Sequence, residues 1–376
     1  MSTVRGTLRR SGLLAALLAL AMAFAAPAAS ATPGSEATEW LASQLKSPAA
    51  GEKYCELFGP NVGQTIDCML AFDAAAGFES EENETYKWIL ANKGSYVGSE
   101  PCSTAKSMSA GAVAKLALAV GAHGGDPMNV EGRNLIADLQ CLQAGSGSEK
   151  GRFEDKGATE FSNVFGQSLA LIALKACQQK KICASPPSLN SALSNGATYL
   201  RGQQCAESKE EGVEGAFRSA MGLEPGACED TTPFPSETEF NVNAVDIDST
   251  GFAIEALFVQ SGAANGEAAK AGGLWMYGKR VVTAGPPKRI HWESYCSFAE
   301  PKAKFPSVNS TALAIMGASE IGLEIAAAEE WLADAVASGE NRGLPACGAT
   351  GNGDVLATAQ GILGLYGASY PTLVGL

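Results

Sequence analysis

The chain has 376 residues, of which 46% are hydrophobic, and it carries a net charge of −13 at neutral pH. A chain this acidic is a poor partner for nucleic acid or an anionic membrane surface, so we exclude both. Only 2 His are present and no Cys-x-x-Cys pair occurs, so the usual zinc spacings are missing and no metal or cofactor is predicted.

The N-terminal residues have the organisation of an export signal. Arginines precede an apolar run that ends at Ala26, and Ala29-Ser30-Ala31 is a small-residue cleavage site. We therefore predict a signal peptide over residues 1–31, cleaved after Ala31, and a secreted domain over residues 32–376. An uncleaved membrane anchor is the alternative. No later segment is predicted to span a membrane.

The cysteine count indicates an oxidising compartment. There are 10 Cys, an even number, in a chain predicted to be exported, which is typical of disulfide-bonded proteins. The sequence does not determine the connectivity. The pairs that we expect are Cys177–Cys183, Cys205–Cys228 and Cys296–Cys347.

Two kinds of helical stretch alternate along the chain. The first kind is amphipathic and often carries an aromatic residue, and we expect it at 37–45, 84–93, 132–143, 195–204, 269–281 and 327–338. The second kind is apolar almost all round, which requires protein on every side. We expect it at 65–78, 109–122, 163–176, 248–262, 309–322 and 354–367.

This regular alternation indicates a repeat architecture. The simplest closed packing is an all-α fold, an α/α toroid of six helical hairpins, in which the apolar helices form an inner ring and the amphipathic helices an outer one. Gly-rich loops join each outer helix to the next inner helix. We expect these loops to gather at one mouth of the ring and to carry the binding function.

Short motifs carry a family resemblance. They are ATEWLASQL at 37–45, DIDSTGFAIEAL at 246–257, VNSTALAIMGA at 308–318 and the loop LQAGSGSEKGRFED at 142–155. In these motifs the chain resembles the prenyltransferase and squalene-cyclase superfamily, whose terpenoid cyclase-like repeats form α/α toroids. The likeness extends over nearly all of residues 35–370 and implies the toroid fold.

The resemblance implies several activities, most of which lack their residues here. Protein prenyltransferases need an Asp-x-Cys zinc pair, thioester proteins need a GCGEQ segment, and cobalamin carriers need an additional β domain; none of these is found in the sequence. Class II terpene cyclases use an Asp-x-Asp-Asp motif whose middle Asp protonates the substrate. Asp246-Ile247-Asp248-Ser249 matches it in part, so the resemblance implies Asp248 as general acid beside Asp246.

Helix capping is the competing interpretation of these acids, and we favour it. Small polar residues recur where the apolar helices begin, and their side-chain oxygens satisfy the first free amide groups. Besides Asp246, the caps that we expect are Ser109, Asn163, Asp248, Asn309 and Asp354. The helix dipole would also lower the pKa of such an acid, which is the opposite of what a proton donor requires.

The mouth loops supply the other candidate site residues. Aromatic rings and a histidine there are candidate contacts for a ligand, and they are His291, Trp292, Tyr295, Phe298, Phe217 and Phe153. Helical barrels of this shape also host enzymes that cleave glycosides with paired carboxylates. The candidate acids for such a pair in the loops are Glu154-Asp155, Glu237 with Glu239, and Glu293.

Three functions follow from these observations. The leading prediction is a non-catalytic binding or interaction module that presents its mouth to an apolar small molecule or an extracellular polymer, because no catalytic constellation is complete. The second is a terpene cyclase-like enzyme with Asp248 as acid. The third is a carbohydrate-active helical barrel. The sequence leaves the oligomeric state open.

Overall fold

Outer and inner helices alternate along the part of the chain that the structure describes. The computed structural model describes residues 31–56, 58–157, 160–179, 187–205, 212–221, 228–231, 241–295, 303–338, 342–346 and 353–376. The outer helices are α1 (Pro33–Gln44), α3 (Glu79–Val97), α5 (Leu135–Cys141), α7 (Pro187–Gly202), α9 (Ala263–Gly278) and α11 (Ala326–Ser338). The inner helices are α2 (Val62–Ala74), α4 (Ala110–Ala122), α6 (Val164–Gln179), α8 (Ile247–Val259), α10 (Val308–Glu320) and α12 (Val355–Leu365).

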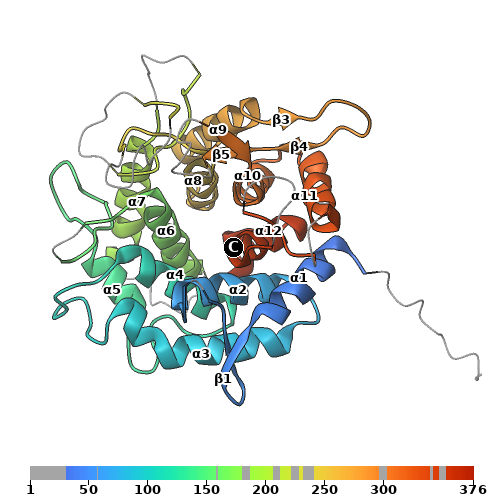
Figure 1. Ribbon diagram of the computed structural model, residues 1–376. Coiled ribbons are helices and arrows are strands. Elements are labelled where there is room, and N and C mark those ends of the chain that lie inside the picture. Colours follow the sequence, from blue (N-terminus) through green and yellow to red (C-terminus); the bar gives the residue numbers. More distant parts are fainter. Residues whose placement is uncertain are drawn as a thin grey trace, which may run out of the picture. The chain divides into compact units, whose positions relative to one another are not determined.

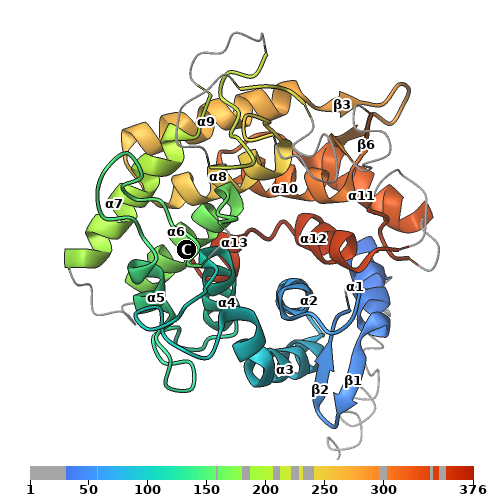
Figure 2. The same ribbon diagram turned by 60° about the vertical axis from the view of Figure 1, so that its left-hand side comes forward.

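The inner helices of the unit Pro33–Leu376 form a closed ring (Figure 1). Each inner helix contacts the next one in chain order, and α12 contacts α2, which completes the circle. The outer helices pack against the outside of this ring, for example α3 on α2 and α9 on α8 (Figure 2). The predicted α/α toroid of six helical hairpins is confirmed.

Burial follows the two helix types. The inner helix α10 buries every residue from Ser310 to Ala318, because it touches protein on all sides. The outer helix α11 buries one stripe at helical spacing, namely Ala328, Trp331, Leu332, Ala335 and Val336. The inner helices approach closely where both carry glycine: a Cβ atom on Gly317 would lie 3.0 Å from the Cα atom of Gly251 in α8.

Three short antiparallel hairpins and a C-terminal turn of helix were not predicted. The hairpins pair β1 (Lys46–Ala49) with β2 (Glu52–Tyr54), β3 (Val281–Val282) with β4 (Ile290–His291), and β5 (Glu293–Tyr295) with β6 (Lys304–Pro306). The short helix α13 (Tyr370–Leu373) contacts α2, α6 and α8. The chain therefore ends inside the ring (Figure 1).

Disulfide bonds link loops to helices and to one another. The predicted bond Cys205–Cys228 is confirmed, and Cys55–Cys68 and Cys102–Cys141 form as well. Cys177 is also disulfide-bonded; its predicted partner Cys183 lies outside the described residues, as do Cys296 and Cys347. Such bonds are typical of proteins outside the cytosol.

None of the helices in the described ranges is both long and apolar enough to cross a membrane. The predicted signal peptide lies almost entirely outside those ranges, so it stays a prediction.

Candidate functional site

A cavity of about 820 Å³ lies inside the ring and receives side chains from all six inner helices. In each inner helix, the residues two and six positions beyond the N-terminal cap, which is the residue just before the helix, lie on one helix face, because the α-helix repeats every 3.6 residues. The residues six positions beyond the cap that line the cavity are Asp67, Lys115, Leu169, Phe252, Leu313 and Gln360. Those two positions beyond it are Gly111, Phe165, Asp248, Asn309 and Leu356.

The cap residues determine which side chains of each inner helix face the cavity. The side chain of each cap accepts the backbone N–H three residues further on, and the caps are Asn61, Ser109, Asn163, Asp246, Ser307 and Asp354. The capping prediction is therefore right for Ser109, Asn163, Asp246 and Asp354. It is wrong for Asp248 and Asn309, because Asp246 and Ser307 start these helices earlier and the later residues face the cavity.

Asp248 is the predicted acid that lines the cavity. Its Oδ1 atom makes no hydrogen bond within the described residues. Burial, and then the charge of Asp246, raises the pKa of Asp248 to about 7, although the Ser310 hydroxyl acts in the opposite direction. A carboxyl group with this pKa keeps its proton close to neutral pH and can donate it to a bound molecule.

Asp246 lies on the other side of the helix start. It accepts the backbone N–H of Ser249 at 2.6 Å and the hydroxyl group of Ser219. Burial raises the pKa of Asp246, and these hydrogen bonds oppose the rise. Asp246 lines a smaller cavity of about 160 Å³, and Ser294 and Tyr295 line both cavities. The two acids of the motif therefore face different spaces.

A second carboxylate lies in the central cavity and was not predicted. Asp67 on α2 accepts a hydrogen bond from Lys115 Nζ on α4 at 2.7 Å. Burial raises the pKa of Asp67, with the charge of Lys115 opposing; burial lowers the pKa of Lys115, but Asp67 and Tyr96 raise it above its ordinary value. The raised pKa of Lys115 keeps its ammonium group charged at neutral pH, where it binds the carboxyl group of Asp67. A single Lys in an apolar helix was the available sequence signal.

The two carboxyl groups belong to opposite sides of the ring. Asp67 comes from α2 and Asp248 from α8, and these helices are three steps apart in a ring of six (Figure 1). A molecule bound in the cavity would therefore have one carboxyl group on each side of it.

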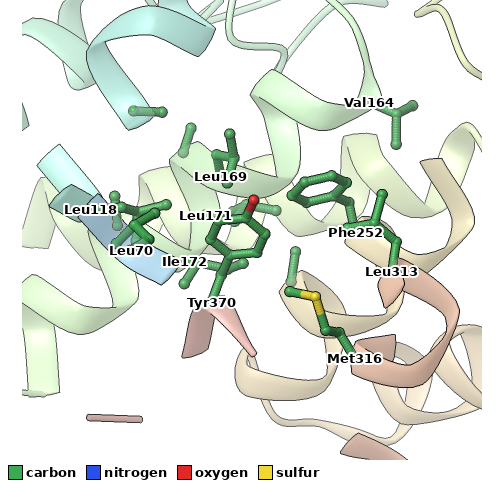
Figure 3. Close-up of a cluster of buried hydrophobic side chains, with 14 of the residues drawn as sticks. Leu70, Leu118, Val164, Leu169, Leu171, Ile172, Phe252, Leu313, Met316 and Tyr370 are labelled. Carbon is green, nitrogen blue, oxygen red and sulfur yellow. The ribbon is translucent and has the colours of Figure 1, made fainter. Parts of the chain in front are cut away.

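Aromatic rings form the inner end of the cavity. Tyr370 of α13 stacks on Phe252 with 5.1 Å between ring centroids, and Phe165 meets Phe252 edge-on at the same separation. Figure 3 shows Phe252 and Tyr370 side by side in a cluster that includes Leu169 and Leu313. The backbone N–H of Tyr370 donates to Glu255 at 2.9 Å. The C-terminal helix thus contributes an aromatic ring to the lining of the cavity.

The aromatic residues predicted as ligand contacts have different locations. Tyr295 lines the central cavity, whereas Phe298 lies outside the described residues. Phe153, Phe217 and Trp292 are buried in the core at 1%, 0% and 1% exposure. Their backbone N–H groups donate to side chains four positions beyond a cap, namely Gln167, Thr250 and Thr311.

His291 is not among the residues that line the central cavity. It is buried and stacks on Trp331 with ring centroids 5.1 Å apart. Burial lowers the pKa of His291, and Glu293, whose Oε1 is 3.9 Å from Nε2, opposes this. At neutral pH the ring is therefore uncharged.

The acids proposed from sequence for glycoside cleavage are not brought together. Asp155 accepts the N–H of Ala110 at 2.8 Å and so supports the start of α4, Glu293 lines the smaller cavity, and Glu237 and Glu239 lie outside the described residues. Within the described ranges, no group of His, Cys, Asp and Glu has the make-up of a metal site. The acids in the central cavity are Asp67 and Asp248 instead.

No family model and no curated protein matches the chain, but solved structures do. An inactive variant of an α-1,6-mannanase of Salegentibacter sp. HEL1_6, in complex with α-1,6-mannotriose, is 11% identical, with a TM-score of 0.59 over 91% of this chain and 98% of that one. The unsaturated glucuronyl hydrolase of Bacillus sp. GL1, responsible for the degradation of glycosaminoglycan, is 10% identical, with a TM-score of 0.54 over 89% of this chain and 95% of that one.

These likenesses correct three sequence-based predictions. The solved structures are glycoside hydrolases, so the toroid part of the family resemblance is supported but its prenyltransferase and terpenoid cyclase part is not. The leading prediction of a non-catalytic module is overturned by the same finding, and so is the preference for a protein that is not an enzyme. At this low identity the comparison shows the α/α-toroid fold.

Proposed function

We propose that this protein is a carbohydrate-active enzyme that hydrolyses a glycosidic bond in an extracellular oligosaccharide or polysaccharide. The observation that carries the proposal is a buried carboxyl group, Asp248, whose pKa is raised to about 7 inside a cavity of about 820 Å³. Cavities of about 300–1,000 Å³ are typical ligand sites. The toroidal fold shared with a mannanase and a glucuronyl hydrolase supports the same class of reaction.

The two carboxyl groups of the cavity suit the two tasks of glycoside hydrolysis. Asp248 would donate its proton to the glycosidic oxygen, so that the C–O bond breaks with a neutral leaving group. Asp67, on the opposite side, would face the positive charge that develops on the sugar ring. It would also accept a proton from the attacking water, while Lys115 at 2.7 Å holds this carboxylate in place.

The remaining lining residues suit a sugar ring. Phe165, Phe252 and Tyr295 offer apolar faces, and Asn309 and Gln360 offer amide groups that can bond to hydroxyls. The predicted signal peptide and the disulfide bonds support an extracellular location, where the substrate would be a polymer or its fragments.

The test is a substrate screen with an active-site variant and a matched control. The purified protein is incubated with α- and β-linked oligosaccharides and polysaccharides, and released sugars are identified by mass spectrometry. Asp248→Asn is expected to lower kcat about 10²–10⁴-fold, as for other general acids. Asp354→Asn makes the same change at the cap of α12, where Asn caps as well as Asp, and is expected to leave the rate unchanged.

Two outcomes would contradict the proposal. The first is that no saccharide in the panel is cleaved by the wild-type protein. The second is that cleavage persists at the wild-type rate in Asp248→Asn, which would remove this residue from the chemistry.

A further inference from the structure

The charges around the central cavity are unevenly distributed, and we infer from them that the site accepts neutral sugars and excludes uronic acids. This inference rests on the proposed function and concerns the same cavity. A uronic acid differs from the corresponding hexose by a carboxylate in place of a hydroxymethyl group. The discriminating feature is therefore the charge that meets position 6 of the sugar.

Among the residues that the structure describes, the cavity offers no free positive charge to such a carboxylate. Among the described residues that line it, Lys115 is the only basic one. Its Nζ atom lies 2.7 Å from Asp67 Oδ2, and the two side chains are 19% and 6% exposed. The charge of Lys115 is already balanced by Asp67, so a sugar carboxylate that bound Lys115 would bring a second negative charge next to Asp67 in a partly buried site, which is unfavourable.

The described lining of the neighbouring cavity does not supply an unpaired cation either. It contains Lys279 and Lys304, but both bind Asp230, at 2.8 and 2.6 Å. Asp246 and Glu293 line the same space. In the lining of this smaller cavity, the acidic side chains therefore balance or exceed the basic ones.

Helix N-termini are the other source of positive potential, and the caps Ser109, Asn163 and Ser307 line the central cavity. The side-chain oxygen of each cap already accepts one of the free amide groups of its helix, which leaves fewer of them for an anion. Two of the caps, Asp246 and Asp354, are carboxylates. The caps therefore weaken the positive potential that the helix ends present to the cavity.

The uncharged lining groups favour a neutral sugar. Asn309 Nδ2 donates to Gln360 Oε1 at 2.6 Å across the gap between α10 and α12. The remaining donors and acceptors of this amide pair suit hydroxyl groups, which donate and accept at once. A sugar carboxylate only accepts, and it would lie in the same cavity as Asp67 and Asp248.

The experiment uses polysaccharide pairs that differ only in this group. Polygalacturonate and hyaluronan are each compared with their carboxyl-reduced forms, in which the uronic acids have become neutral hexoses, alongside neutral α-mannan and xylan. Binding of oligosaccharides from each pair to the full chain is measured by calorimetry at low salt, and cleavage by release of reducing ends. We expect the neutral form to bind at least about tenfold more tightly, because a sugar carboxylate would lose its hydration in a partly buried site whose described lining offers it no unpaired cation.

A charge-adding variant tests the cause. Gln360→Lys places an ammonium group in the cavity without altering Asp67 or Asp248, and Gln360→Met is the uncharged control of similar length. The neutral-over-acidic preference should fall about tenfold or more in Gln360→Lys and persist in Gln360→Met.

The outcomes separate this inference from the proposed function. Equal or tighter binding of the acidic form by the wild-type protein overturns the charge-based selectivity while a saccharide hydrolase remains. A preference unchanged in Gln360→Lys overturns the electrostatic cause. Failure to bind or cleave any member of the panel overturns both.

Discussion

Two opposing effects act on the carboxyl group of Asp248 at the second residue of α8. The helix dipole at the N-terminus favours its charged form, and this effect led to the expectation of a lowered pKa. Burial and the charge of Asp246 favour the neutral form, and they prevail, since the pKa of Asp248 is raised to about 7. The dipole is partly offset because Asp246 already occupies the cap and brings a carboxyl group of its own.

The pH dependence of catalysis follows from this balance. A general acid works in its protonated form, so kcat/KM should fall as the pH rises through about 7, the pKa of Asp248. Asp246→Asn keeps the cap but removes the nearby charge that raises this pKa. The fall should therefore move to lower pH in the variant, which a pH–rate profile of both proteins measures.

Asp354→Asn is the control for that shift, because it makes the same change at a cap that is not among the residues lining the central cavity. A profile for Asp246→Asn that coincides with the wild-type profile would show that the charge of Asp246 does not act on the catalytic acid.

At the scale of elements, one hydrogen bond recurs between each loop and the helix that follows it. The side chain four positions beyond the cap accepts a backbone N–H from the preceding loop. The accepting residues are Thr65, Gln167, Thr250, Thr311 and Thr358, and the donors are Cys55, Phe153, Phe217, Trp292 and Leu344. This bond draws the predicted mouth aromatics into the core. Helix α4, with Val113 at this position, is the exception.

The recurrent bond should contribute measurably to stability. Thr311→Val keeps the shape of the side chain but leaves the buried N–H of Trp292 without its acceptor at 3.0 Å. Such an unsatisfied group costs about 1–3 kcal/mol, and urea unfolding measures the loss. Thr198→Val on the exposed face of α7, where the hydroxyl bonds within its own helix, should change the free energy of unfolding by less than about 0.5 kcal/mol. Equal losses of unfolding free energy in the two variants would show that the hydrogen bond from the loop to Thr311 does not stabilise the domain more than a surface hydroxyl does.

The sequence predicted the helices well and their starting points less well. All-round apolarity separates inner from outer helices, and this pattern is a property of single segments. The first residue of each helix is harder to predict. Polar residues that can cap a helix occur two positions apart at Asp246 and Asp248, and at Ser307 and Asn309. Backbone geometry decides between them, and that decision determines which acid faces the cavity.

Contacts between helices were beyond the reach of sequence patterns. Asp67 and Lys115 meet only because α2 and α4 are neighbours in the ring. Similarly, the sequence predicted the last inner helix over 354–367 but not the short helix that follows it. The chain turns at Gly367, which has a φ angle of 60°, and Ser369 caps the separate helix α13 with a capping box.

At the scale of the whole molecule, both ends of the described domain help to close the ring. Near its start, α1 packs on α12 and α11, and at the C-terminus α13 contacts α2, α6 and α8 from within (Figure 2). Glu255 of α8 holds α13 by accepting the N–H of Tyr370 at 2.9 Å, while its Oε1 makes no hydrogen bond within the described residues. The inner end of the cavity thus depends on a carboxyl group that is 0% exposed.

This carboxyl group should make the stability of the domain depend on pH. Burial raises the pKa of Glu255 well above its ordinary value of 4.5, with the N–H of Tyr370 opposing and the charge of Glu320 adding to the rise. Above pH 4.5 the unfolded chain therefore loses a proton that the folded protein keeps, so the free energy of unfolding falls as the pH rises through that range. Glu255→Gln removes this term because an amide does not ionise in that range.

The variant should consequently gain stability relative to the wild type as the pH rises from 4.5 to about 8, as measured by urea unfolding at each pH. Glu267→Gln on the exposed surface of α9 is the matched control, for which we expect the difference from wild type to stay constant. If the Glu255→Gln difference is also flat, the buried carboxyl is not a source of pH-dependent strain between α8 and α13. A difference that widens with pH would show that the domain is most stable at pH values at which Glu255 is protonated.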